Sequence, residues 1–119
     1  MLELLIRIFE ERGALVIGVR TGSAALEALG SREGIEFNLL VSDISLPGID
    51  GYELMRRIRT ELKVPSDRLP AVAVTAFGRK EDRQRALQAG FQTHLAKPYD
   101  ASKLVATARD LLRGRVEGL

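Results

Sequence analysis

The chain contains no cysteine and a single histidine, His94, among its 119 residues. The lack of cysteine excludes a disulfide scaffold, catalysis by a thiolate and a zinc site built on cysteine. One histidine excludes a metal site with two histidine ligands within the chain. The two tyrosines and four phenylalanines form no stacking series, and basic residues alternate with acidic ones, so the sequence shows no nucleic-acid-binding surface.

Long apolar runs and a large net charge are also missing. The formal charge is +2, from 18 basic against 16 acidic residues. The longest apolar runs are a few residues, so no segment is expected to span a membrane, and Met1 begins directly on an amphipathic pattern rather than a secretion signal. We therefore predict a soluble, cytoplasmic protein that binds neither membrane nor nucleic acid.

The length and composition suit one globular domain. Hydrophobic residues make up 45% and charged residues 29% of the chain. A chain of this size buries roughly 65% of its unfolded surface, enough for a single core. We expect a domain over residues 1–113 and a frayed C-terminal tail over residues 114–119.

Helical and strand-like patterns alternate along this domain. Helices are expected from residue 2, from residue 22, after Asp50, from residue 80 and after Asp100, and Asp50 is expected to form a capping box with Glu53. Four short apolar runs are predicted as strands, at residues 15–19, 37–43, 71–75 and 91–97. This alternation predicts an α/β fold with a parallel sheet and helices on both faces.

Polar residues end three of the predicted strands: Asp43, Thr75 and Lys97. Ligands of open α/β sheets bind beyond the carboxyl ends of the strands. A carboxylate nucleophile with a hydroxyl and an ammonium to stabilise phosphoryl oxygens would form a phosphoryl-transfer site. The alternative is that Thr75 only favours a strand and Lys97 is solvated. A carboxylate such as Asp43 at the end of a buried strand, however, costs desolvation free energy unless a cation or hydrogen-bond donors compensate it, and Lys97 is the candidate cation.

Several segments resemble response-regulator receiver domains, the phosphoacceptor modules of two-component signalling. Residues 40–51, Leu-Val-Ser-Asp-Ile-Ser-Leu-Pro-Gly-Ile-Asp-Gly, resemble the phosphoacceptor segment of that family. Val74-Thr75-Ala76 resembles its Thr/Ser-Ala step, and residues 89–98 resemble its Ala-Gly-aromatic and Lys-Pro segments. The resemblance implies a flavodoxin-like, doubly wound parallel sheet.

The resemblance also implies roles for individual residues. Asp43 would accept a phosphoryl group from a histidine kinase or a histidine phosphotransfer protein, and Mg²⁺ would bind Asp43 and the backbone carbonyl of Ser45. Thr75 would bond a phosphoryl oxygen and, with His94, act as the switch, while Lys97 would pair with Asp43. His94 stands where the family usually has an aromatic, and its alternative role is that of a surface histidine.

The family normally begins with a strand that ends in an acidic pair of Mg²⁺ ligands, and no such strand precedes the first helix of this sequence. A late-assigned start codon, a trimmed product and a natural short form are the alternatives. We therefore expect weak Mg²⁺ binding, slow phosphorylation and a sheet that lacks the first of the usual five strands. The strand edges left unpaired would be closed by direct pairing of the runs at 15–19 and 37–43, or by strand exchange in a homodimer.

Three functions remain open from the sequence. The first is a phosphoacceptor signalling module with at most slow autodephosphorylation, either a stand-alone regulator or a receiver of a hybrid histidine kinase. The second is a receiver-like binding module that is not phosphorylated because it lacks the acidic pair. The third is an aspartyl-phosphate hydrolase of the haloacid-dehalogenase type, which would need an Asp where this chain has Ser45.

Overall fold

The computed structural model describes residues 2–30, 36–75, 80–97 and 100–117, so Ala76 and Pro98 of the predicted motifs lie outside the described residues. Helices and strands alternate after the first two helices. Their order is α1 (Leu2–Glu10), α2 (Gly22–Gly30), β1 (Leu40–Asp43), α3 (Gly51–Thr60), β2 (Ala71–Thr75), α4 (Lys80–Ala89), β3 (Thr93–Ala96) and α5 (Ala101–Glu117). No helix in these ranges is long and apolar enough to cross a membrane.

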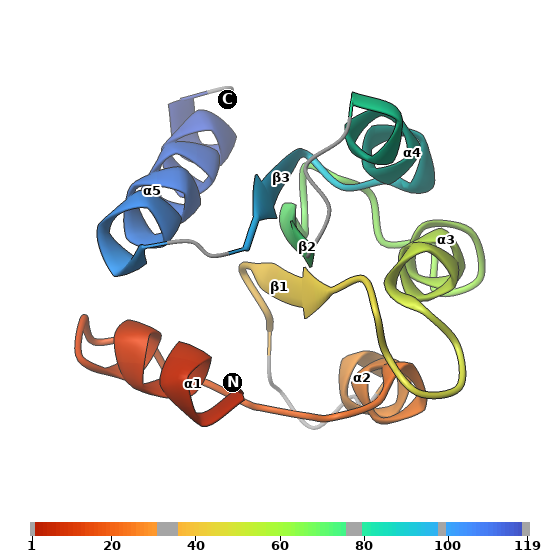
Figure 1. Cartoon of the computed structure of the whole chain (residues 1–119), viewed down its shortest axis with the longest axis horizontal. Coiled ribbons are helices and arrows are strands. Elements are labelled where there is room, and N and C mark those ends of the chain that lie inside the picture. The colour runs from red at the N-terminus through yellow and green to blue at the C-terminus, as the bar shows by residue number, and fades with distance from the viewer. Residues whose placement is uncertain (1, 31–35, 76–79, 98–99, 118–119) are drawn as a thin grey trace.

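The three described strands form one parallel sheet in the order β1-β2-β3. Helices α1 and α5 cover one face, and α2, α3 and α4 cover the other (Figure 1). The central strand β2 is buried along its whole length, as expected for a parallel strand covered on both faces. The predicted fold class, a parallel α/β sheet between two helical layers, is confirmed.

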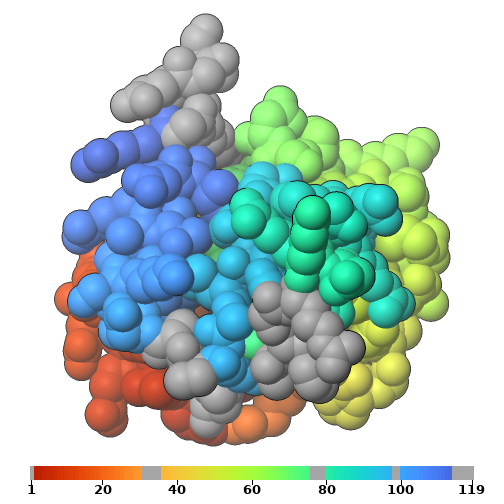
Figure 2. All heavy atoms as spheres, turned by 45° about the horizontal axis from the view of Figure 1, so that its top comes forward, coloured from red at the N-terminus to blue at the C-terminus, as the bar shows by residue number. Residues whose placement is uncertain are grey.

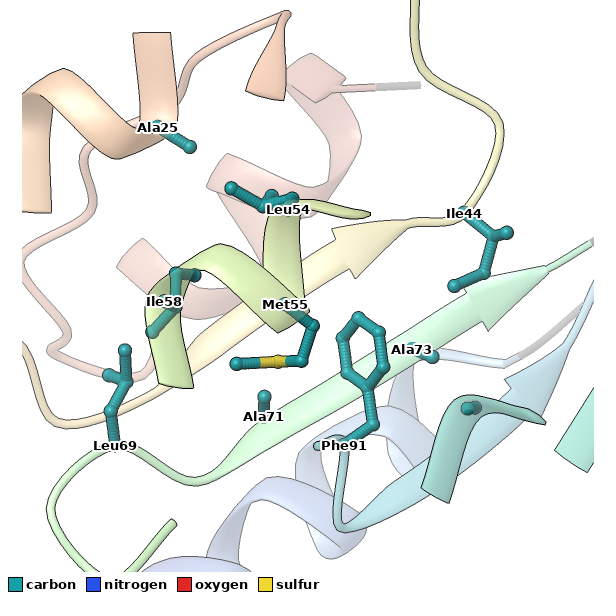
Figure 3. Packing of buried hydrophobic residues seen from close by; sticks show 10 residues of the cluster. Ala25, Ile44, Leu54, Met55, Ile58, Leu69, Ala71, Ala73 and Phe91 are labelled. Carbon is teal, nitrogen blue, oxygen red and sulfur yellow. The ribbon is translucent and has the colours of Figure 1, made fainter. Parts of the chain in front are cut away.

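The layer containing α3 is packed closely against the sheet. Met55 of α3 and the ring of Phe91 lie over Ala71 and Ala73 of β2 (Figure 3). The small alanine side chains leave room for these larger ones, while Val72 points to the opposite layer. The alternation of alanine and valine in β2 therefore places small side chains under α3 and larger ones toward α1 and α5.

One predicted strand is wrong. Residues 14–19 form neither helix nor strand, Leu15 is fully exposed and Ile17 is 50% exposed. The apolar, β-branched composition favours a strand, but a strand needs a neighbour to satisfy its backbone groups. The described sheet ends at β1, and the segment does not pair with it, so the expected direct pairing of residues 15–19 with the run at 37–43 is also wrong.

The other predicted helices and strands are present in the structure and differ from the prediction mainly in where they begin and end. The strand at 71–75 is as predicted, whereas those at 37–43 and 91–97 are reduced to Leu40–Asp43 and Thr93–Ala96. Helix α5 continues to Glu117, beyond the end expected at residue 113. A single glycine at position 114 lowers helix propensity by only about 1 kcal/mol, which does not stop a long helix.

Helix α3 begins as predicted at Asp50, but only half of the capping box forms. The carboxylate of Asp50 accepts a hydrogen bond of 2.8 Å from the backbone N–H of Glu53. The side chain of Glu53 binds Arg56 and Arg57 along the helix instead of returning to Asp50. Two guanidinium groups compete better for this carboxylate than one backbone N–H.

We expect the carboxyl group of Glu53 to titrate at unusually low pH. Hydrogen bonds from Arg56 and then Arg57 lower its pKa from 4.5 to about 2. Because the folded pKa is lowered, the stabilisation from these pairs is complete above pH 4.5 and is lost as the pH falls through about 2. Carboxyl chemical shifts followed by NMR will show this midpoint, and Arg56→Gln should raise it. A midpoint near 4.5 in the unmodified chain would contradict the prediction.

The turn after α3 places a non-glycine residue in the left-handed region. Lys63 has a φ of 57°, and the N–H of Val64 returns to the carbonyl of Ile58 at 3.0 Å. We expect Lys63→Gly to stabilise the fold by about 1 kcal/mol, because glycine adopts this conformation without steric cost. Urea unfolding will measure the gain. Lys63→Ala, which retains a Cβ, is the control and should give little of it.

Candidate functional site

A carboxylate and an ammonium group meet at the carboxyl edge of the sheet. Asp43 is the last residue of β1, and Lys97 directly follows β3. The Nζ atom of Lys97 lies 2.7 Å from Oδ2 of Asp43, and their side chains are 23% and 28% exposed. The pairing of Asp43 with Lys97 that the sequence analysis expected is therefore present, in a position that solvent still reaches.

Ser45 contacts the other oxygen of the same carboxylate. Its backbone N–H donates a hydrogen bond of 3.1 Å to Oδ1 of Asp43. Each oxygen of Asp43 therefore accepts one hydrogen bond, a short charged one at Oδ2 and a longer neutral one at Oδ1. Charged hydrogen bonds are the stronger kind, so Oδ1 is the oxygen that is held less tightly.

Thr75 lies on β2, which pairs with β1, and His94 lies on β3, which pairs with the other side of β2. Thr75 ends β2 and is buried, and its carbonyl accepts a hydrogen bond of 2.7 Å from the backbone N–H of Lys97. Since Asp43 is paired in register with Val74, Thr75 lies one residue further along the same edge. His94 lies opposite Ala73, inside β3 and half-buried, so it is set back from the edge that carries Asp43 and Lys97.

Two side chains that belong to no sequence motif fix the pairing register of β3 against β2. Gln92 accepts a hydrogen bond of 2.6 Å from the N–H of Ala71 through its Oε1, and its own backbone N–H donates to the carbonyl of Ala71. Arg59 of α3 donates to the carbonyl of Gly90 at 2.8 Å. These bonds fix the start of β3 against β2, and therefore the position of Lys97. Neither residue can be predicted from the sequence as part of the site, because isolated Gln and Arg residues carry no local signal.

Gly51 packs against the backbone of the acceptor strand. Its N–H donates a hydrogen bond of 2.8 Å to the carbonyl of Ile44. A Cβ atom at this position would lie 2.7 Å from the carbonyl oxygen of Asp43 and 2.8 Å from the Cα of Ile44. Only glycine allows α3 to begin so close to Asp43, which explains the glycine that follows Asp50.

The site offers few ligands for a metal ion. Within the described ranges, no three His, Asp or Glu residues lie close enough together to hold one. Asp43 supplies one carboxylate, and Ser45 follows it on an exposed loop whose carbonyl groups are the remaining oxygen donors. Mg²⁺ binds proteins through one or two carboxylates together with water and phosphate oxygens. Asp43 and Ser45 meet the lower limit of this requirement.

The fold and the site together define a doubly wound α/β domain with a solvent-accessible carboxylate–lysine pair at the carboxyl edge of its parallel sheet. The family described as response regulator receiver domain matches residues 1–109 of the chain. The chain belongs to this family, and the resemblance noted in the sequence is confirmed.

Two proteins illustrate the sequence similarity. The chain is 43% identical over 103 residues to an uncharacterized 14.6 kDa protein from the sodA1 3′ region of Leptolyngbya boryana, covering 87% of this chain and 75% of that protein. It is 39% identical over 74 residues to the response regulator Rre1 of a Synechocystis strain, covering 62% of this chain. The matched region spans only 31% of that longer regulator.

Solved structures show the same fold. A CheY-like receiver domain protein of Methanospirillum hungatei superposes with a TM-score of 0.84 at 24% identity, covering 99% of this chain and 89% of that one. The receiver domain of the sensor histidine kinase PA1611 of Pseudomonas aeruginosa, with magnesium in its active-site cleft, gives a TM-score of 0.77 at 28% identity. That match covers 92% of this chain and 86% of the other. Receiver domains of both regulators and kinases are therefore similar to this chain.

Proposed function

We propose that this chain is a phosphoacceptor module of a two-component system, in which Asp43 takes a phosphoryl group from a histidine kinase or a histidine phosphotransfer protein. The observation that carries the proposal is the contact of 2.7 Å between Lys97 and Asp43 at a solvent-accessible strand end. The ammonium group compensates the carboxylate before transfer and can bind a phosphoryl oxygen afterwards. A cytoplasmic location belongs to the same proposal.

In the proposed reaction, one oxygen of Asp43 attacks the phosphorus atom of a phosphohistidine. A P–O bond forms while the P–N bond breaks, the bonding electrons pass to the imidazole nitrogen, and the ring takes up a proton from solvent. Oδ1 is the attacking oxygen, because its bond to the Ser45 N–H is longer than the bond of Oδ2 to Lys97. Later hydrolysis of the acyl phosphate returns the carboxylate and inorganic phosphate.

Mg²⁺ is part of the proposal as a weakly held cofactor. Asp43 and the backbone carbonyl of Ser45 would hold it, and a bound Mg²⁺ neutralises the charge of a transferring phosphoryl group. With one carboxylate in the described site, affinity before phosphorylation is expected to be low and phosphorylation slow.

Phosphorylation is proposed to switch a protein-interaction surface on α4, β3 and α5. These elements lie side by side on one face of the molecule (Figure 2). Thr75 is the proposed link, because its backbone bonds Lys97 and its strand pairs with β3, which carries His94. Thr75 would move toward a phosphoryl oxygen and His94 would respond on the neighbouring strand.

Intact-mass measurement tests the proposal. The chain is incubated with a small acyl phosphate and Mg²⁺ beside Asp43→Asn and Asp50→Asn variants. Asp50 is the matched control, since its carboxylate caps α3 nearby and asparagine also caps helices. We expect a phosphoryl gain in the unmodified chain and in Asp50→Asn, and none in Asp43→Asn. A gain that survives Asp43→Asn would overturn the assignment of the acceptor.

A receiver-like binding module without phosphorylation is the second candidate. It is favoured by the lack of a three-residue metal-ligand group among the residues that the structure describes. The same experiment separates the two functions, because this module would gain no phosphoryl group even at high Mg²⁺ concentration.

A further inference from the structure

The outer edge of β1 carries backbone groups that no other described strand covers. The N–H of Leu40 donates to the carbonyl of Pro70, just before β2, at 3.0 Å. The N–H of Ile44, just after β1, donates to the carbonyl of Val74 in β2 at 3.1 Å. Alternate residues of a strand direct their backbone groups to opposite sides, so those of Val41 and Asp43 point away from β2. The carbonyl of Asp43 accepts a bond from the hydroxyl of Ser42, which leaves Val41 at the centre of the uncovered edge.

This edge lies between two apolar layers. Val41 packs with the cluster of α1 and α5, and Leu40 packs with the cluster of α2 and α3, yet both remain only half-buried. A strand added here would be covered by helices on both faces. It would therefore need apolar side chains on both of its faces.

The chain carries a segment with that composition. Residues 15–19 read Leu-Val-Ile-Gly-Val, rich in β-branched residues, and pair with none of the strands that the structure describes. Leu15 is fully exposed and Ile17 is 50% exposed, so apolar surface is left in water. In Figure 1 this connection between α1 and α2 runs past β1 without joining the sheet.

We propose that residues 15–19 of one copy of the chain pair with the outer edge of β1 in a second copy, and the reverse, to form a strand-exchanged homodimer. Each copy supplies both an uncovered edge and an unpaired apolar segment, so the contact is self-complementary and closes with twofold symmetry. Exchange covers the outer edge of β1 in both copies.

Moving the N-terminal helix α1 to the partner should cost little free energy. Helix α1 has one buried residue, Ile8, and packs against α5. It can leave the α5 of its own copy and form the same contacts with the α5 of the partner, as in domain swapping. The ion pair of Glu3 with Arg20 is exposed at both side chains and offers little resistance. Residues 20 and 21, just before α2, would act as the hinge.

Size-exclusion chromatography with light scattering on the full chain tests the proposal. We expect a mass twice the 13.1 kDa of the chain at high concentration. Val41→Pro removes the outward N–H without removing a bond to β2, and proline is tolerated at strand edges. It should weaken dimerisation about tenfold or more. Val41→Ala, which trims the side chain but retains the N–H, should still dimerise.

A second pair of variants keeps the test valid if Val41→Pro does not fold. Ile17→Lys adds a charge at a side chain that is half-exposed in a single copy but would be buried in the exchanged dimer. Leu87→Lys on α4 is its control, with 45% exposure outside the proposed interface. We expect Ile17→Lys to be monomeric and Leu87→Lys to remain dimeric. A single-copy mass for the unmodified chain at every concentration, or a dimer unaffected by Ile17→Lys, would overturn the proposal.

Discussion

Gly51→Ala is expected to destabilise the protein by about 3 kcal/mol, the upper part of the range for overpacking a tight contact. The added methyl group would meet the carbonyl oxygen of Asp43 at 2.7 Å and the Cα of Ile44 at 2.8 Å. Both are backbone atoms, and the bond from the Gly51 N–H to the Ile44 carbonyl prevents the helix from moving away without loss of that bond. Thermal unfolding should show a fall in Tm of about 12 °C.

Gly30→Ala is the matched control for this effect. Gly30 is also a helical glycine, at the end of α2, and a Cβ atom there would meet nothing within 4 Å. The same chemical change should therefore be neutral or stabilise the fold by about 0.5 kcal/mol through higher helix propensity. Equal losses of stability in both variants would show that the close approach of α3 to Asp43 is not the cause.

Lys97→Met is expected to lower the rate of phosphorylation by about 100-fold, in the range found when one preorganised donor to a developing charge is removed. Methionine has a similar length but no charge, so it cannot bond Oδ2 of Asp43 or a phosphoryl oxygen. Intact mass followed over time with a small acyl phosphate measures the rate. Because the phosphodonor is small, the result does not depend on docking of a kinase.

Lys103→Met provides the control for the loss of one positive charge. Lys103 is exposed on α5, away from the strand ends that carry the site. Its replacement should leave the rate within about twofold, since an exposed charge is screened by solvent and salt. If Lys97→Met were phosphorylated as fast as Lys103→Met, the ammonium group would have no part in the transfer.

The Gly51→Ala and Lys97→Met variants separate the structural support of the site from its chemistry. Gly51→Ala acts through the packing of α3 on the residues around Asp43, whereas Lys97→Met removes a group that contacts the carboxylate. The first should change stability most, and the second should change the phosphorylation rate most. Measuring both properties on both variants therefore tests whether geometry and electrostatics contribute independently.

Local chemistry in the sequence determined much of this protein. The alternating apolar runs predicted the parallel α/β sheet, Asp50 predicted the start of α3, and the strand-end positions of Asp43 and Lys97 predicted their meeting. Each of these features depends on a residue and its near neighbours in the chain, or on the rule that parallel strands end at one edge. The motif around Asp43 then identified the family.

Only the tertiary structure decided the features that depend on distant partners. Residues 15–19 have the composition of a strand, but no described strand lies beside them, so they form none. Glu53 fits a capping box, yet Arg56 and Arg57 take its carboxylate. Gln92 sets the register of β3 through a bond to Ala71, 21 residues away in the sequence. Hydrogen bonds and packing between remote segments select among local preferences, and a single sequence does not show which segments will meet.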